Sequence, residues 1–139
     1  MEIEIQAALT RVATAIKSEN LSDAMSGFDS NLKYYPANAA IIGGWEDYNQ
    51  FRTRLSKFFA GASITDFSLT SLAISPGLES TAMARGILTC SYSDSKGDNK
   101  TISEQIEISL EKFTKWGITE MYAYDNSTGQ SGMYFPPIP

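Results

Sequence analysis

Apolar residues in the first half of the chain recur at steps of three and four, the spacing of a helix with one buried face. This spacing predicts a helix over residues 3–18. Ser22 predicts the start of a second, short helix running to about Phe28, because serine side chains cap helix N-termini. A third helix is predicted from Trp45 to Gly61, since glycine favours a helix end. The apolar stripe of the first helix consists of Ile5, Ala8, Leu9, Val12, Ala15 and Ile16. The apolar stripe of the third consists of Tyr48, Phe51, Leu55, Phe58 and Phe59.

After Gly61 the apolar residues alternate with polar ones, which predicts strands. Four strands are expected, at residues 64–74, 79–92, 100–113 and 118–124. In the third of these, the even-numbered positions from 102 to 110 are mostly apolar and the odd-numbered ones polar. In the last, Ile118, Tyr122 and Tyr124 are in phase with one another.

An earlier short strand is predicted from Leu32 to Tyr35, because Pro36 disfavours helical angles at the residue before it. Helices followed by antiparallel strands are typical of an α+β domain with the helices on one sheet face. A long sheet with one apolar face must then curve around those helices. We expect a single domain over residues 1–125 and a C-terminal tail over 126–139, in which Met133, Tyr134 and Phe135 could dock on a neighbour.

Composition removes several classes of function. The chain has 139 residues, a net charge of −5 and no run of basic residues, which argues against a nucleic-acid partner. It contains no histidine, so the commonest general base and metal ligand are missing. Cys90 is the only cysteine and is expected to be a small buried residue. We therefore expect no metal site and no cofactor.

The start of the chain is acidic, unlike a signal peptide, and no apolar run reaches the roughly 18 residues of a membrane-spanning helix. These features predict a soluble, cytoplasmic protein that does not contact a membrane.

The order of elements resembles the nuclear transport factor 2-like superfamily, which includes ketosteroid isomerases and SnoaL-like polyketide cyclases. The resemblance covers residues 3–125. It rests on the helix junction from Ile16 to Phe28, on Leu32-Lys33-Tyr34-Tyr35-Pro36, on the Gly44-Trp45 helix start, and on the segment from Glu111 to Ile118. In that last segment the order Trp116-Gly117 departs from the more usual Gly-x-Trp.

The resemblance implies a cone-like fold in which a curved, mostly antiparallel sheet holds the N-terminal helices in its concave face and leaves an apolar pocket at the open end. It also implies a homodimer formed through the outer sheet face. The ketosteroid isomerases place an aspartate base before the proline that corresponds to Pro36, where this chain has Tyr35, a poor base at neutral pH. They also use a first-helix tyrosine, and residues 3–18 contain none. Isomerase activity is therefore not expected.

Other side chains are candidates for a site. Glu104 breaks the apolar face of its strand, and Glu120 is in phase with Ile118 and Tyr122, so either carboxylate could enter an apolar pocket and act as an acid or base, or simply face solvent. Arg85 could bind an acidic ligand group or pair with a strand carboxylate. The predicted ligand-binding residues are Tyr35, Trp45, Tyr48, Arg85, Tyr122 and Tyr124, although aromatic residues at such spacing can equally be core.

These observations predict a protein that binds a small apolar or aromatic ligand, with no established reaction. Two alternatives remain open. One is an enzyme of isomerase, cyclase or dehydratase type that uses Glu104 or Glu120 as its base. The other is an interaction or dimerisation module whose pocket is closed by its own side chains.

Overall fold

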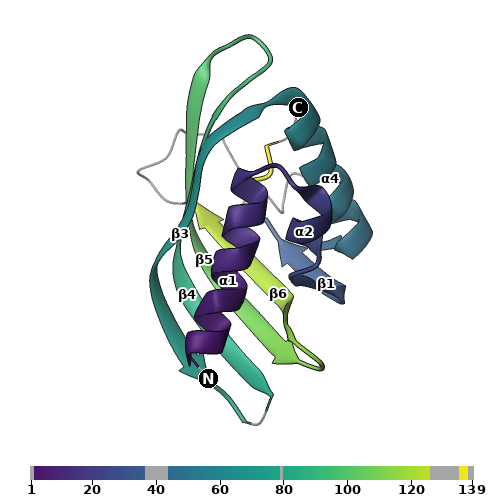
Figure 1. Cartoon of the computed structure of the whole chain (residues 1–139), viewed down its shortest axis with the longest axis vertical. Helices are drawn as coiled ribbons and strands as arrows, with labels where there is room; N and C mark the ends of the chain where they lie inside the picture. Colours follow the sequence, from purple (N-terminus) through teal and green to yellow (C-terminus); the bar gives the residue numbers. More distant parts are fainter. Residues whose placement is uncertain (1, 37–43, 79, 126–134, 138–139) are drawn as a thin grey trace.

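The structure is a computed structural model that describes residues 2–36, 44–78, 80–125 and 135–137. Helix α1 (Glu2–Lys17) lies across the face of a six-stranded sheet, and α2 (Leu21–Met25) and α4 (Tyr48–Gly61) cover the other end of the same face (Figure 1). The sheet curves around these helices. The predicted α+β class, with helices in the concave face of a mostly antiparallel sheet, is confirmed.

The strands are β1 (Phe28–Tyr35), β2 (Glu46–Asp47), β3 (Ser63–Pro76), β4 (Thr81–Ser93), β5 (Asn99–Lys112) and β6 (Trp116–Asp125). Their order in the sheet is β2-β1-β6-β5-β4-β3. The pair β1–β6 is parallel and the other pairs are antiparallel. The first strand of the chain therefore lies beside the last one.

Both predicted boundaries of the second helix are wrong. The cap of α2 is Asn20, not Ser22, because the Asn20 side chain accepts a hydrogen bond from the backbone N–H of Asp23. Helix α2 ends at Met25, and Phe28 already belongs to β1.

The third predicted helix begins at Tyr48 rather than at Trp45. Asp47 is its N-cap, and Gln50 completes a capping box in which each side chain binds the other residue's backbone N–H. The residues before the helix, Glu46 and Asp47, pair with β1 instead.

Strand β6 carries a bulge that reverses the phase predicted from its sequence. Leu110 of β5 lies opposite Ile118, but the preceding residue, Ser109, lies opposite Glu120. One extra residue of β6, Thr119, is therefore inserted between these pairs. After the bulge, Met121 and Ala123 face the helices and are buried, while the residues between them face outward.

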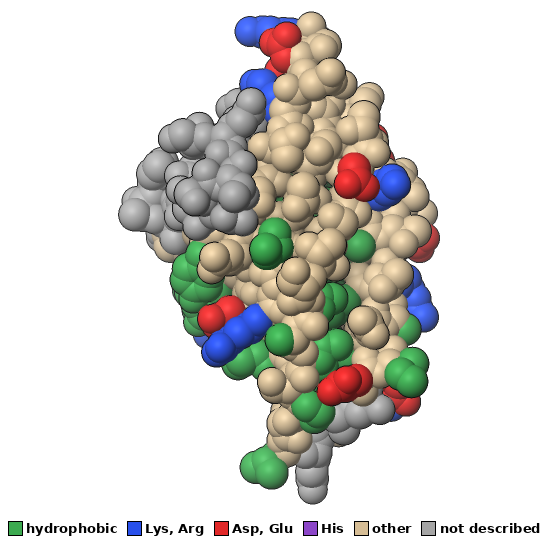
Figure 2. Space-filling view, turned by 90° about the vertical axis from the view of Figure 1, so that its left-hand side faces the viewer, with side chains coloured by type: hydrophobic (Ala, Val, Ile, Leu, Met, Phe, Trp, Pro, Cys, Tyr) green, Lys and Arg blue, Asp and Glu red, His purple; other side chains and the backbone are tan. Residues whose placement is uncertain are grey.

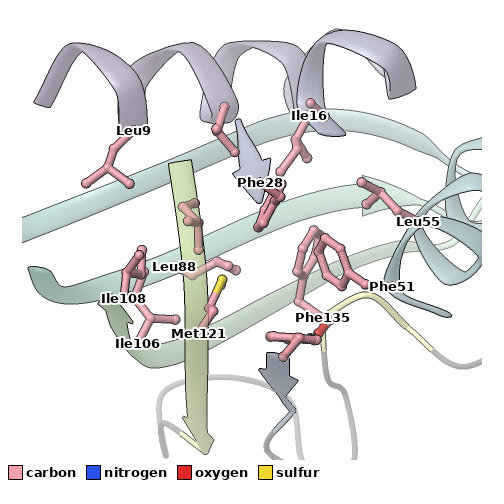
Figure 3. Packing of buried hydrophobic residues seen from close by; sticks show 14 of the residues in the cluster. Leu9, Ile16, Phe28, Phe51, Leu55, Leu88, Ile106, Ile108, Met121 and Phe135 are labelled. Carbon is pink, nitrogen blue, oxygen red and sulfur yellow. Dashed lines mark hydrogen bonds between the residues drawn. The ribbon is translucent and has the colours of Figure 1, made fainter. Parts of the chain in front are cut away.

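The core is one cluster of apolar side chains between the helices and the concave sheet face. In Figure 3, Leu9 and Ile16 of α1 point toward the strands, and Phe135 lies on the opposite side of the cluster. Phe135 is only 1% exposed, so this residue of the expected tail packs inside its own domain rather than on a neighbour. Met133 and Tyr134, which were expected to dock with it, lie outside the described residues. Cys90 is buried in the same cluster, as predicted.

Candidate functional site

Glu104 lies inside the cone. The even-numbered residues of β5 face the helices, so Glu104 points the same way as its neighbours Ile102 and Ile106 and is fully buried. Its Oε1 accepts a hydrogen bond from the backbone N–H of Phe135, with a donor–acceptor distance of 3.2 Å. A carboxylate in an apolar interior needs such partners, because burying it otherwise costs several kcal/mol.

Tyr34 reaches the same residue from β1. It alternates in phase with Leu32, is fully buried, and packs edge-on against Phe51 with 4.8 Å between the ring centroids. Its hydroxyl donates a hydrogen bond to the backbone carbonyl of Phe135. Burial, reinforced by the charge of Glu104, raises the pKa of Tyr34 well above its usual value of 10. The phenol therefore keeps its proton and acts as a hydrogen-bond donor.

Arg54 and Glu46 form an ion pair beside these residues. The Arg54 Nη1 atom donates to Glu46 Oε1 at 2.9 Å, and the two side chains are only 14% and 10% exposed. Arg54 also donates from Nη2 to the backbone carbonyl of Pro136. Burial is the main reason that the pKa of Glu46 lies above its usual value of 4.5, although Arg54 acts against the rise.

The ring of Phe135 occupies an aromatic slot next to these polar groups. It packs against Phe58 and Phe67, with centroid distances of 5.9 and 5.2 Å. The segment Phe135–Pro137 is thus held by its ring and by three side chains that bind its backbone: Glu104, Tyr34 and Arg54. We call this set of three side chains and the aromatic slot the interior site.

Most of the predicted ligand-binding residues lie elsewhere. Tyr35 and Tyr122 are opposite each other on β1 and β6, stacked at 4.2 Å on the outer sheet face, where Tyr124 is 46% exposed. Arg85 faces outward from β4 and pairs with Glu107 at 3.5 Å. These four residues therefore lie outside the cone. For Tyr122 and Tyr124 the reason is the bulge in β6, which turns them outward. A role of the four residues in ligand binding stays a prediction.

The three remaining candidate residues are Glu120, Trp45 and Tyr48. Glu120 is half-buried on the outer face, where it lies with Lys33 along a hollow of about 540 Å³. Trp45 is 48% exposed, with the Lys33 ammonium 5.2 Å from its ring centroid. Tyr48 is half-buried against the core, and its hydroxyl donates to the Met25 carbonyl at 3.5 Å. Of the two candidate bases, only Glu104 lies in the interior.

Arg54 and Glu46 were not among the candidate residues, and Tyr34 was not among the predicted ligand-binding residues. Arg54 lies three residues after Phe51 and four before Phe58, so it interrupts the apolar stripe of its helix. A charge at such a position is a usable signal of a buried polar contact. Among the described residues, no group of three His, Cys, Asp or Glu side chains could hold a metal ion. No helix in the described ranges is long and apolar enough to cross a membrane.

Comparisons with known proteins support the fold alone. No family model matches the sequence, and no curated protein matches it. Among solved structures, an NTF2-like protein of unknown function in nutrient uptake from Rhodospirillum rubrum aligns with a TM-score of 0.72 and 9% identity, over 88% of this chain and 98% of that one. A protein of unknown function with a cystatin-like fold from Nostoc punctiforme aligns with a TM-score of 0.68 and 13% identity, over 92% of both chains.

A candidate scytalone dehydratase from Novosphingobium aromaticivorans aligns with a TM-score of 0.74 and 11% identity, over 88% of this chain and 81% of that one. Identities this low carry no activity from one protein to another. The structural alignments do agree with the element order and the curved sheet described above. The chain has the nuclear transport factor 2-like, cystatin-like cone fold.

Proposed function

We propose that this protein binds a small, mostly apolar ligand in the interior site. The observation that carries the proposal is the convergence of Tyr34, Glu104 and Arg54 on one short segment inside an aromatic-lined interior. Apolar walls with a few converging polar groups are typical of small-molecule sites. The proposed ligand would occupy the place that Phe135–Pro137 holds in the structure.

The test is native mass spectrometry of the full chain, followed by denaturing analysis of any molecule released. We expect a copurified small molecule, and its loss or reduction in Glu104→Gln. The matched control is Glu107→Gln on the outer face of the same strand, which should keep the molecule. Equal retention by both variants would contradict the interior site.

A second proposal concerns self-association. The stacked pair of Tyr35 and Tyr122 and the exposed Tyr124 make the outer sheet face aromatic, and aromatic residues are enriched in interfaces. We propose that two copies of the chain pair through this face. Tyr124→Asp should then convert a dimer to a monomer in light scattering. Phe113→Asp, at a 71% exposed residue beyond the end of β5, should leave the dimer intact.

An alternative proposal is a catalytic role with Glu104 as the base, which the burial of Glu104 inside the cone supports. Glu104 and Tyr34 contact the N–H and the carbonyl of the same residue, so a bound substrate could meet a carboxylate and a phenol together. Such a pair suits acid–base chemistry of the isomerase, cyclase or dehydratase type. Turnover that Glu104→Gln abolishes and Glu120→Gln preserves would support this alternative.

A further inference from the structure

The segment Phe135–Pro137 is held in the way that a ligand is held. The ring of Phe135 enters the aromatic slot between Phe58 and Phe67. The three polar contacts go to backbone atoms of the segment: its N–H to Glu104, the carbonyl of Phe135 to Tyr34, and the carbonyl of Pro136 to Arg54. Since backbone atoms are common to every peptide, these contacts select an amide rather than a side chain.

The chemistry of the three side chains matches this arrangement. Glu104 supplies an acceptor, Tyr34 supplies a neutral donor whose proton is retained on burial, and Arg54 supplies a charged donor. A matching ligand therefore presents an N–H, a carbonyl and a second carbonyl in that order, beside an aromatic ring. A peptide in which an aromatic residue is followed by a second residue has this pattern.

We infer that the interior site binds short peptides in which an aromatic residue is followed by a second residue, and that Phe135–Pro136 is the chain's own competing occupant. The inference rests on the proposed ligand-binding function and names the ligand class for the same site. An occupant that belongs to the same chain binds intramolecularly, so it competes at an effective concentration that does not depend on the protein concentration. A free ligand must displace it, so the unchanged chain binds such a ligand more weakly than a chain whose own occupant is impaired.

The test uses the full chain with Phe135→Ala, which removes the ring that fills the slot. The probe is N-acetyl-phenylalanyl-prolinamide, and the matched probe without the ring is N-acetyl-alanyl-prolinamide. Titration calorimetry should show the aromatic probe binding Phe135→Ala about tenfold or more tighter than it binds the unchanged chain. The alanine probe should bind at least about tenfold more weakly than the aromatic one, because it leaves the slot empty.

Two further variants test whether the probe is bound through the contacts of the interior site. Adding Tyr34→Phe to Phe135→Ala removes the donor to the carbonyl and should weaken the aromatic probe about fivefold to tenfold, the usual value of one hydrogen bond. Phe113→Ala is the exposed control and should bind the probe as the unchanged chain does. If Phe135→Ala does not fold, Phe135→Leu keeps an apolar side chain in the slot and replaces it in every titration.

Equal binding of the two probes, or binding that Tyr34→Phe does not change, would overturn the inference. A hydrophobic fluorescent dye separates this failure from failure of the proposed function. If Phe135→Ala binds the dye in the interior and Phe58→Ala reduces that binding, but the aromatic probe does not bind, the apolar site stands and the peptide class is wrong. If neither the dye nor the aromatic probe binds, both proposals fall.

Discussion

The ion pair between Arg54 and Glu46 gives the sharpest test of how the interior site is held together. Arg54→Met keeps an unbranched, mostly apolar stem and removes the charge and the donors of the side chain. The change breaks the 2.9 Å contact with Glu46 and the contact with the Pro136 carbonyl at once. Glu46 is then left as a nearly buried carboxylate without its cation.

The expected loss of stability in Arg54→Met follows from the burial of the Arg54–Glu46 pair. Removing one partner of a buried pair costs about 3–5 kcal/mol, because the other charge stays desolvated. Since Arg54 and Glu46 keep 14% and 10% of their exposure, we expect the lower end, about 3 kcal/mol. In urea unfolding, with a slope of about 1–3 kcal/mol per molar, this loss lowers the midpoint by roughly 1–3 M.

Arg52→Met is the matched control, because Arg52 is an exposed arginine on the same helix. It should change the free energy of unfolding by no more than about 0.5 kcal/mol. Adding Glu46→Gln to Arg54→Met removes the stranded charge, so the double variant should be more stable than the sum of the single changes by about 0.5–3 kcal/mol. If Arg54→Met and Arg52→Met unfold at the same urea concentration, the reasoning about this pair is refuted.

Three other outcomes are expected. A Cβ at Gly86 would lie 2.6 Å from the Thr70 carbonyl oxygen, so Gly86→Ala should lower the free energy of unfolding by about 1–3 kcal/mol, measured by thermal or urea unfolding. Gly61→Ala is the control and should leave that free energy unchanged, because a Cβ at Gly61 has nothing within 4 Å. Equal effects of the two changes would contradict this account. Burial raises the pKa of Glu46, so the folded state holds that proton more tightly than the unfolded one, and the stability contributed by this group falls as the pH rises from 4.5 through the raised value. Glu46→Gln should lack that fall, and a stability difference from the unchanged chain that is constant with pH would refute the assignment. Burial also raises the pKa of Cys90 to about 12, so a thiol reagent should label it only as fast as the chain unfolds; immediate labelling of the folded chain would show that the thiol is accessible.

Local patterns in the sequence were sufficient for most of the fold. The stripe from Ile5 to Ile16 predicted the buried face of α1, and strict alternation predicted which side of β5 faces the helices. These predictions succeed because side-chain direction in a regular helix or strand depends only on position along it. Glu104 was found for the same reason, as a charge at an inward position.

The site itself depended on features that no local pattern contains. A single inserted residue at Thr119 reverses the phase of β6, and alternation read on from Ile118 therefore assigned Tyr122 and Tyr124 to the wrong face. The docking of Phe135 on Tyr34 joins residues that are 101 positions apart. Contacts at such separation are decided by the assembled shape of the interior, which periodicity does not describe.

The parallel pairing of β1 with β6 has a consequence for how the chain reaches its folded state. Strand β1 is made early during synthesis, yet its main partner in the sheet, β6, is the last of the described strands along the chain. Contacts between distant parts of a chain form slowly, because a long loop must close before they stabilise anything. The hairpins β3–β4 and β4–β5 can form as they emerge, whereas β1 must wait with an exposed edge. Factors that shield unpaired strands during translation would therefore matter most for Phe28–Tyr35, the strand that carries Tyr34 into the site.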